Sequence, residues 1–331
     1  MQFLSDNAAA VHPKVWEALR AADAADAPYD GDALSQWLDA AFSELFGKEC
    51  AALWVATGTA SNCLALATMV EPHGGVVCHR EAHIETDECG APGFYLHGAK
   101  LLLAEGEGAK LTMEGIGEVL AGITRGIHQV PAQAISLTQA SEYGLAYRPT
   151  ELAAIGALAA ERGLGLHLDG ARFANAVAFL GCSPAEAAGP ADALSLGFTK
   201  NGGMGADAVV FFDPVRADLA RWRRKRAGHL QSKGRFLAAQ ILALLEGGLW
   251  LENARAANAA AQEVASGAGE RLVHPVEANE VFLRLSLDER AVLRSQGFAF
   301  YDWDEHSARI VASWDTRIED AITLGKAIAA L

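Results

Sequence analysis

In the stretch Gly163-Leu164-Gly165-Leu166-His167-Leu168-Asp169-Gly170-Ala171-Arg172, an apolar, strand-like run ends in an acid and a base. A second such run ends at Ser195-Leu196-Gly197-Phe198-Thr199-Lys200, and a glycine-rich loop to Gly205 follows it. In an open α/β sheet, ligands bind at the carboxyl ends of the strands. We therefore expect Asp169 and Lys200 to meet over one small molecule.

Pyridoxal phosphate is a cofactor that needs both of these partners, because a lysine forms a Schiff base with it and an aspartate keeps its pyridine nitrogen protonated. The chain also offers a candidate for each remaining task of amino-acid chemistry. Backbone N–H groups and hydroxyls of Thr57-Gly58-Thr59, between a short strand and a helix, suit a phosphate. His83 suits ring stacking, and Arg172 or Arg309 suits a substrate carboxylate, which a guanidinium binds in bidentate fashion.

Composition narrows the class of protein. The chain has 331 residues, of which 51% are hydrophobic, and a net charge of −14, so nucleic acid is not an expected partner. The start of the chain has no basic segment followed by an apolar run, and no later apolar run is long enough for a membrane span. Five scattered cysteines without a CxxC pair indicate reduced thiols, a cytoplasmic location and no structural metal site.

Short apolar strands alternate with helices over 50–212, which predicts βαβ units and a mostly parallel sheet. Helices are expected over 13–27 and 33–47, and a long one over 234–262 that breaks near Gly247-Gly248. Alternating segments and a final helix follow in a small α+β unit. The expected division is therefore a large cofactor-binding domain, 1–240 with the N-terminal segment, and a small C-terminal domain, 241–331.

The only basic run is Arg221-Trp222-Arg223-Arg224-Lys225-Arg226. We interpret it first as a solvated helix face, and second as a source of positive charge for a phosphate near a subunit contact.

The segment His167-Leu168-Asp169-Gly170-Ala171-Arg172 resembles the HxDGAR motif of the L-threonine aldolases. Ser5-Asp6-Asn7, Thr57-Gly58-Thr59-Ala60-Ser61-Asn62, Ala82-His83 and Thr199-Lys200-Asn201-Gly202 match that family at compatible spacing. The stretches Asp87–Pro92 and Arg223–Leu230 look most similar to its bacterial phenylserine aldolase branch. The resemblance covers nearly the whole chain, although Asn7 stands where many members have threonine.

The resemblance implies an aspartate-aminotransferase-like α/β fold, that of the fold-type I pyridoxal phosphate enzymes. It also implies retro-aldol cleavage of β-hydroxy-α-amino acids to glycine and an aldehyde. In that case Lys200 holds the cofactor, Asp169 pairs with its ring nitrogen, and His83 stacks on the ring and assists at the β-hydroxyl.

The resemblance further implies a substrate carboxylate held by Ser5, Arg172 and Arg309. It places His128 near the substrate hydroxyl, donated across a dimer interface, in a homo-oligomer that is usually a tetramer. The neighbouring subunit's phosphate would then be contacted by Lys225 or Lys233.

Two alternatives remain open from the sequence. The first keeps the cofactor but changes the reaction to that of a β-eliminating lyase or an aminotransferase of the same fold. The second is a scaffold or regulator that has lost its chemistry, although a dead site need not keep Lys200 and Asp169. A nicotinamide-dependent dehydrogenase is disfavoured, because no GxGxxG opens a βαβ unit.

Overall fold

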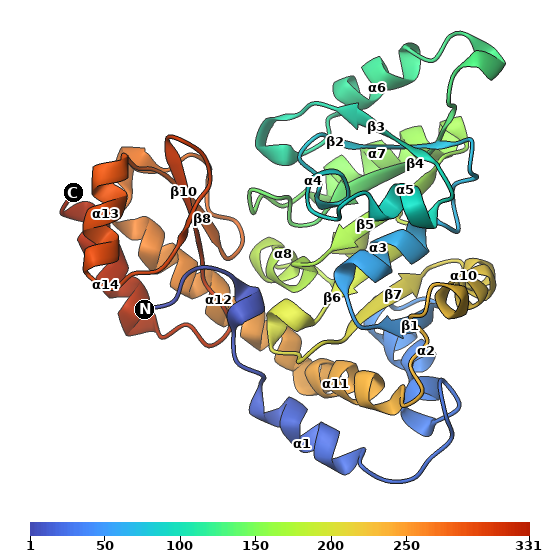
Figure 1. Cartoon of the computed structure of the whole chain (residues 1–331), viewed down its shortest axis with the longest axis horizontal. Helices are drawn as coiled ribbons and strands as arrows, with labels where there is room; N and C mark the ends of the chain where they lie inside the picture. The colour runs from blue at the N-terminus through green and yellow to red at the C-terminus, as the bar shows by residue number, and fades with distance from the viewer.

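The computed structural model describes all 331 residues, and its largest sheet has seven strands in the order β1-β7-β6-β5-β4-β2-β3 (Figure 1). Strand β7 is antiparallel to both of its neighbours, and the other four pairings are parallel. The predicted mostly parallel sheet is confirmed. Its strands are β1 (Ala51–Val55), β2 (Gly75–His79), β3 (Lys100–Ala104), β4 (Ala132–Thr138), β5 (Gly165–Gly170), β6 (Ala193–Gly197) and β7 (Asp207–Phe211).

Fourteen α-helices surround this sheet and a second, smaller one. They are α1 (Pro13–Ala21), α2 (Ala33–Phe46), α3 (Gly58–Leu66), α4 (His83–Thr86), α5 (Ala91–Tyr95), α6 (Met113–Ala121), α7 (Pro149–Arg162), α8 (Phe173–Leu180), α9 (Pro184–Ala188), α10 (Pro214–Arg226), α11 (Arg235–Leu245), α12 (Leu249–Ser266), α13 (Leu287–Ser295) and α14 (Ile318–Ala329). None of these helices combines the length and the apolar character that crossing a bilayer requires.

Helices cover both faces of the large sheet, because successive side chains of a strand point to opposite sides. On β1, Ala52 and Trp54 belong to the largest apolar cluster, together with residues of α2 and α11. Leu53 and Val55 of the same strand belong to a separate cluster with α3 and α10. Both faces are therefore buried, and the carboxyl edge of the sheet remains as the place where a ligand can enter.

The second sheet has three antiparallel strands in the order β8-β10-β9, and α12 and α14 pack beside it. The N-terminal segment completes this unit, since Phe3 is buried in its core. The backbone N–H of Phe3 donates to Ala299 O at 2.8 Å, and its carbonyl accepts from Val311 N at 3.0 Å. The strands are β8 (Glu280–Arg284), β9 (Tyr301–Asp302) and β10 (Ser307–Val311).

One helix prediction differs from the structure at its end, and one predicted helix break is confirmed. The first helix stops at Ala21, because the carbonyl of Ala22 is taken by Nε of Arg235 at 3.0 Å rather than by a further helical turn. The long helix expected over 234–262 is broken as predicted and forms α11 and α12. The break is at Gly247 and Gly248, whose φ angles of 61° and 76° an α-helix cannot contain.

The basic run lies at the end of α10, and one of its members is buried. Arg224 donates to Trp54 O at 3.0 Å, stacks on the Trp54 ring and forms an ion pair with Asp30. Lys225 and Arg226 are exposed. The interpretation as a solvated face therefore holds for these two residues and is wrong for Arg224, which ties α10 to the end of β1.

We predict that Arg224→Ala lowers the free energy of unfolding by about 3 kcal/mol, because it leaves Asp30 and the Trp54 carbonyl without their buried partner. Urea denaturation of the two proteins measures the loss. Arg226→Ala removes the same charge from the same helix and should change stability by less than about 0.5 kcal/mol. Equal losses in the two variants would contradict a specific role for Arg224.

Candidate active site

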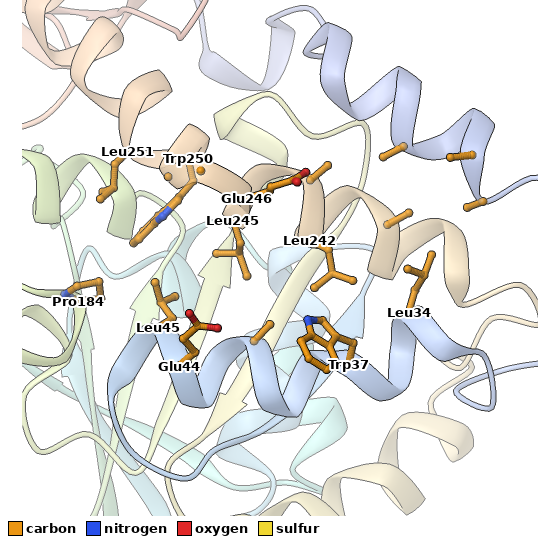
Figure 2. A pocket seen from close by; sticks show the side chains of 18 residues that line it. Leu34, Trp37, Glu44, Leu45, Pro184, Leu242, Leu245, Glu246, Trp250 and Leu251 are labelled. Carbon is orange, nitrogen blue, oxygen red and sulfur yellow. The ribbon is translucent and has the colours of Figure 1, made fainter.

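Among the hollows in the large-sheet part of the molecule, two differ sharply in character. The wider one, about 940 Å³, is an apolar crevice in which Trp37 and Leu45 on α2 face Leu242 and Leu245 on α11 (Figure 2). Apart from two glutamates, it offers no group for chemistry. The second is a cavity of about 240 Å³ at the carboxyl edge of the sheet, and it is lined mainly by polar side chains.

The smaller cavity brings together several of the residues expected from the sequence, which come from separate strands and loops. Thr57, Gly58, His83, Asp169, Arg172 and Lys200 all line it. Asp207 lines it as well. Because β7 runs opposite to its neighbours, the first residue of this strand lies at the edge where the other strands end.

Asp169 is held rigidly at the end of β5. Its Oδ2 accepts a hydrogen bond from Asn62 Nδ2 at 2.7 Å, and its Oδ1 accepts from Ala171 N at 3.0 Å. Gly170 must be glycine here, because a Cβ would lie 2.8 Å from Ser195 O. The carboxylate is buried at the cavity, where it can accept a hydrogen bond from a positively charged group.

His83 begins the short helix α4 and is oriented by a buried acid. Its Nδ1 lies 2.9 Å from Oε1 of Glu88, which also accepts from Asn62 Nδ2 at 2.9 Å. The hydrogen bond to Glu88 raises the pKa of the imidazole, against the opposing effect of burial. The ring therefore retains its proton more readily than a free histidine does.

Lys200 lies in the short 3₁₀ turn Thr199–Asn201, and Asp207 fixes the start of that turn. Oδ1 of Asp207 accepts from Phe198 N at 2.8 Å, from Thr199 N at 3.0 Å and from Thr199 Oγ1 at 3.1 Å. Gly203 follows so closely that a Cβ would lie 2.8 Å from Phe198 O. Nζ of Lys200 makes no hydrogen bond or ion pair within the chain, which leaves this amine available for a covalent bond.

The N-terminus of α3 opens toward the same cavity. Thr57 caps the helix by accepting from Ala60 N at 3.2 Å, and the backbone N–H groups of Gly58 and Thr59 have no partner in the chain. Unpaired N–H groups and the positive end of the helix dipole together favour a phosphate. The side chain of Thr59 is not part of the cavity lining.

Arg172 is buried in an ion-pair network that joins three parts of the chain. Its Nε and Nη2 donate to the two oxygens of Asp6, at 2.8 and 3.0 Å, and Nη1 lies 3.3 Å from Oε2 of Glu280 on β8. Burial alone would lower the pKa of Arg172, but the charges of Asp6 and Glu280 outweigh it and raise that pKa. Nη1 is thus the guanidinium nitrogen least committed to a partner.

Three of the residues expected at the substrate lie outside the cavity lining. Arg309 on β10 lies 3.9 Å from Oε1 of Glu280 and stacks against Trp303. Ser5 caps the 3₁₀ turn Asp6–Ala8, and its neighbour Asn7 lines the cavity instead. His128 lies on an exposed turn, Gly126–His128.

The polar residues at or beside the cavity that were not singled out from the sequence include Asn62, Glu88, Glu142 and Asp207. The position of Glu88, five residues after His83 in an otherwise polar segment, was a usable signal. Asp207 could not be found without knowing that β7 is reversed. Glu142 follows the end of β4, and this strand-end position was the signal that could have identified it, as it identified Asp169 and Lys200.

The residues present fit pyridoxal phosphate. The cavity holds a free lysine amine, a buried carboxylate, a histidine and an unpaired helix N-terminus, which match in turn the aldehyde, the ring nitrogen, the ring face and the phosphate of that cofactor. Asn62 Oδ1, beside Asp169, is also buried without a hydrogen-bond partner. It can therefore accept a hydrogen bond from a group that binds in the cavity.

Comparison with known proteins agrees with this geometry. The family model of the β-eliminating lyases matches residues 2–288. A low-specificity L-threonine aldolase of a Pseudomonas species is 45% identical over 95% of this chain and 93% of that protein.

Solved structures give the same fold. A threonine aldolase of Leishmania major superimposes with a TM-score of 0.93 at 26% identity, over 99% of this chain and 98% of that one. An aspartate aminotransferase of Rhodobacter sphaeroides superimposes with a TM-score of 0.72 at 16% identity, over 100% and 92% of the two chains. The expected aspartate-aminotransferase-like fold is confirmed, and the chain belongs to the β-eliminating lyase family.

Proposed function

We propose that this protein is an aldolase that cleaves β-hydroxy-α-amino acids, of the L-threonine, L-allo-threonine or L-phenylserine type, to glycine and an aldehyde. The observation that carries the proposal is the meeting of Lys200, Asp169 and Arg172 in one cavity of a chain that is 45% identical to a threonine aldolase. The cofactor is pyridoxal 5′-phosphate, which supplies an electron sink at the substrate Cα when bound.

In this proposal the cofactor-binding residues are Thr57, Gly58, Thr59, His83, Asp169, Arg172 and Lys200. The Lys200 amine forms the covalent bond, and the unpaired N–H groups at the start of α3 bind the phosphate. Asp169, whose two oxygens are fixed by Asn62 and Ala171, keeps the ring nitrogen protonated. His83 covers the ring, and its bond to Glu88 fixes the plane of the imidazole.

The substrate carboxylate is proposed to lie against the guanidinium groups of Arg172 and Arg309, with Ser5 nearby. The hydrogen bonds from Arg172 to Asp6 orient that guanidinium and leave Nη1 for the substrate. Arg309 is held near Glu280 and the ring of Trp303. Both arginines are thus positioned before a substrate enters, which reduces the entropy lost on binding.

The assembly and location are also proposals. We infer a homo-oligomer, a dimer or tetramer with active sites at the dimer interface, in which His128 serves the neighbouring site. An exposed position for His128 and for its neighbour Ile127 supports this, because both would be covered by a second subunit. Five unpaired cysteines support a cytoplasmic location. We retain 1–240 and 241–331 as the proposed domains, the boundary lying on α11 before its break at Gly247.

Purified protein supplied with cofactor should release glycine and acetaldehyde from L-threonine, and glycine and benzaldehyde from L-phenylserine. Amino-acid analysis and aldehyde trapping measure both products, and the ratio of the two rates identifies the preferred side chain. Ammonia with a keto acid would instead indicate a β-eliminating lyase. A keto acid with an aminated cofactor would indicate an aminotransferase.

Lys200→Ala should abolish both turnover and the yellow absorbance of the lysine-bound cofactor, because no other amine lines the cavity. His83→Ala is the matched comparison, and it should keep the colour while losing rate, because it removes a ring contact and not the covalent bond. Absorbance spectra and product assays test both variants. Undiminished turnover by Lys200→Ala would refute the proposed chemistry.

A further inference from the structure

The proposed function gives no role to Glu142, although its carboxyl lies in the cavity. It lines the cavity together with His83, Asp169 and Lys200. Its Oε1 accepts a hydrogen bond from the backbone N–H of His83 at 3.1 Å. Its Oε2 accepts none, so one oxygen of this carboxyl remains free for a group that enters the cavity.

The backbone on both sides of Glu142 is anchored. Ser141 N donates to Leu145 O at 2.8 Å, and Ser141 Oγ donates to Gly108 O at 2.7 Å. On the other side, Gly144 N donates to Ser141 O at 2.8 Å. The side chain of Tyr143 is held as well, because its hydroxyl donates to Glu81 Oε1 at 2.9 Å. A carboxyl on such an anchored turn is held in place. A group that contacts a reacting substrate atom needs a fixed position of this kind.

The charged groups that face Glu142 come from four separate elements. They are Asp169 on β5, Arg172 just after β5, His83 on α4, Lys200 after β6 and Glu280 on β8. Burial raises the pKa of Glu142 to about 7 and the charge of Asp169 adds to this effect, while His83 and Lys200 oppose it. A carboxyl with such a pKa can both accept and release a proton near neutral pH.

His83 is less suited to accept a proton in the same cavity. Its Nδ1 is committed to Glu88 at 2.9 Å, and that hydrogen bond raises the pKa of the imidazole. Lys200 and Asp169 already have roles in the proposed function, at the cofactor's aldehyde and at its ring nitrogen. Two lining carboxyls keep a free oxygen in a fixed position, Glu142 and Asp207. Asp207 is bonded to the turn that carries Lys200, whereas Glu142 contacts His83, the residue expected beside the β-hydroxyl.

We propose that Glu142 is the general base that removes the proton of the substrate β-hydroxyl, an inference that rests on the proposed function. The O–H bond breaks and its proton binds to Glu142, while the electron pair left on oxygen forms the aldehyde carbonyl. The Cα–Cβ bond breaks and its electron pair stays with Cα. Cα then gains one proton from solvent, Glu142 releases one, and glycine leaves with no net change in protons.

The first test compares Glu142→Gln with the wild type and with Glu85→Gln, which makes the same change at an exposed position on α4. Glu142→Gln should keep the cofactor absorbance and lose about 100-fold or more in kcat. In the wild type and in Glu85→Gln, kcat should rise with pH through about 7, because the carboxyl must be ionised to accept a proton. Glu142→Gln should lack that rise.

The second test observes the carboxyl itself. In infrared difference spectra of the holoenzyme, the wild type should lose a protonated-carboxyl band with a midpoint near pH 7, and Glu142→Gln should lack this band. Subtracting the two spectra removes the contributions of Glu280 and Asp207, whose pKa values burial also raises.

Thermal unfolding gives an independent readout. Because the native pKa of Glu142 lies above its ordinary value of 4.5, the stability that this group contributes is complete below about pH 4.5 and is lost as pH rises to about 7. Glutamine cannot ionise. The Tm of Glu142→Gln should therefore rise relative to that of the wild type between about pH 5 and about pH 8.

A wild-type kcat and an unchanged pH profile in Glu142→Gln would overturn the assignment, as would a wild type without the infrared band. Failure of the wild type to release an aldehyde would overturn the proposed function and this assignment with it. If the wild type releases an aldehyde and Glu142→Gln releases it equally fast, only the assignment of Glu142 is overturned. The two failures are therefore distinguishable.

Discussion

The carboxylate of Asp207 accepts three hydrogen bonds from the two residues that precede Lys200, and the position of that lysine depends on them. This contact is available only because β7 is antiparallel to both of its neighbours. Had β7 been parallel, its first residue would lie at the opposite edge of the sheet. One reversed strand thus places a buried acid beneath the loop that carries the reactive amine.

A network of buried ion pairs fixes the part of the site that is proposed to bind the substrate. Arg172 from the large sheet, Asp6 from the N-terminal segment and Glu280 from the small sheet meet in the interior. Separating buried ions is costly, so the three segments are coupled to one another. The orientation of the Arg172 guanidinium is therefore fixed by residues distant from it in sequence, and not by the helix that Arg172 precedes.

Much of the fold and part of the site could be predicted from the sequence, since both followed from local patterns. Apolar strands that end in Asp169 or Lys200 can be recognised from periodicity and from the glycines that follow. Reversal of β7 could not be recognised, because a buried strand has the same apolar pattern in either direction. The burial of Arg224 was also hidden, since its neighbours Arg223 and Lys225 have the composition of a solvated surface. Glu142 had no motif of its own beyond its position after a strand end, and the shape of the cavity singles it out.

The pairing of Phe3 with Ala299 and Val311 has a consequence for how the chain is made. Phe3 is synthesised before the strands of the large sheet, and the two residues that complete its surroundings are synthesised after them. The strands and helices of the large sheet can assemble earlier, as their partners appear in order. The small sheet must wait for both strands, β9 and β10, so Phe3 stays exposed while the large sheet assembles.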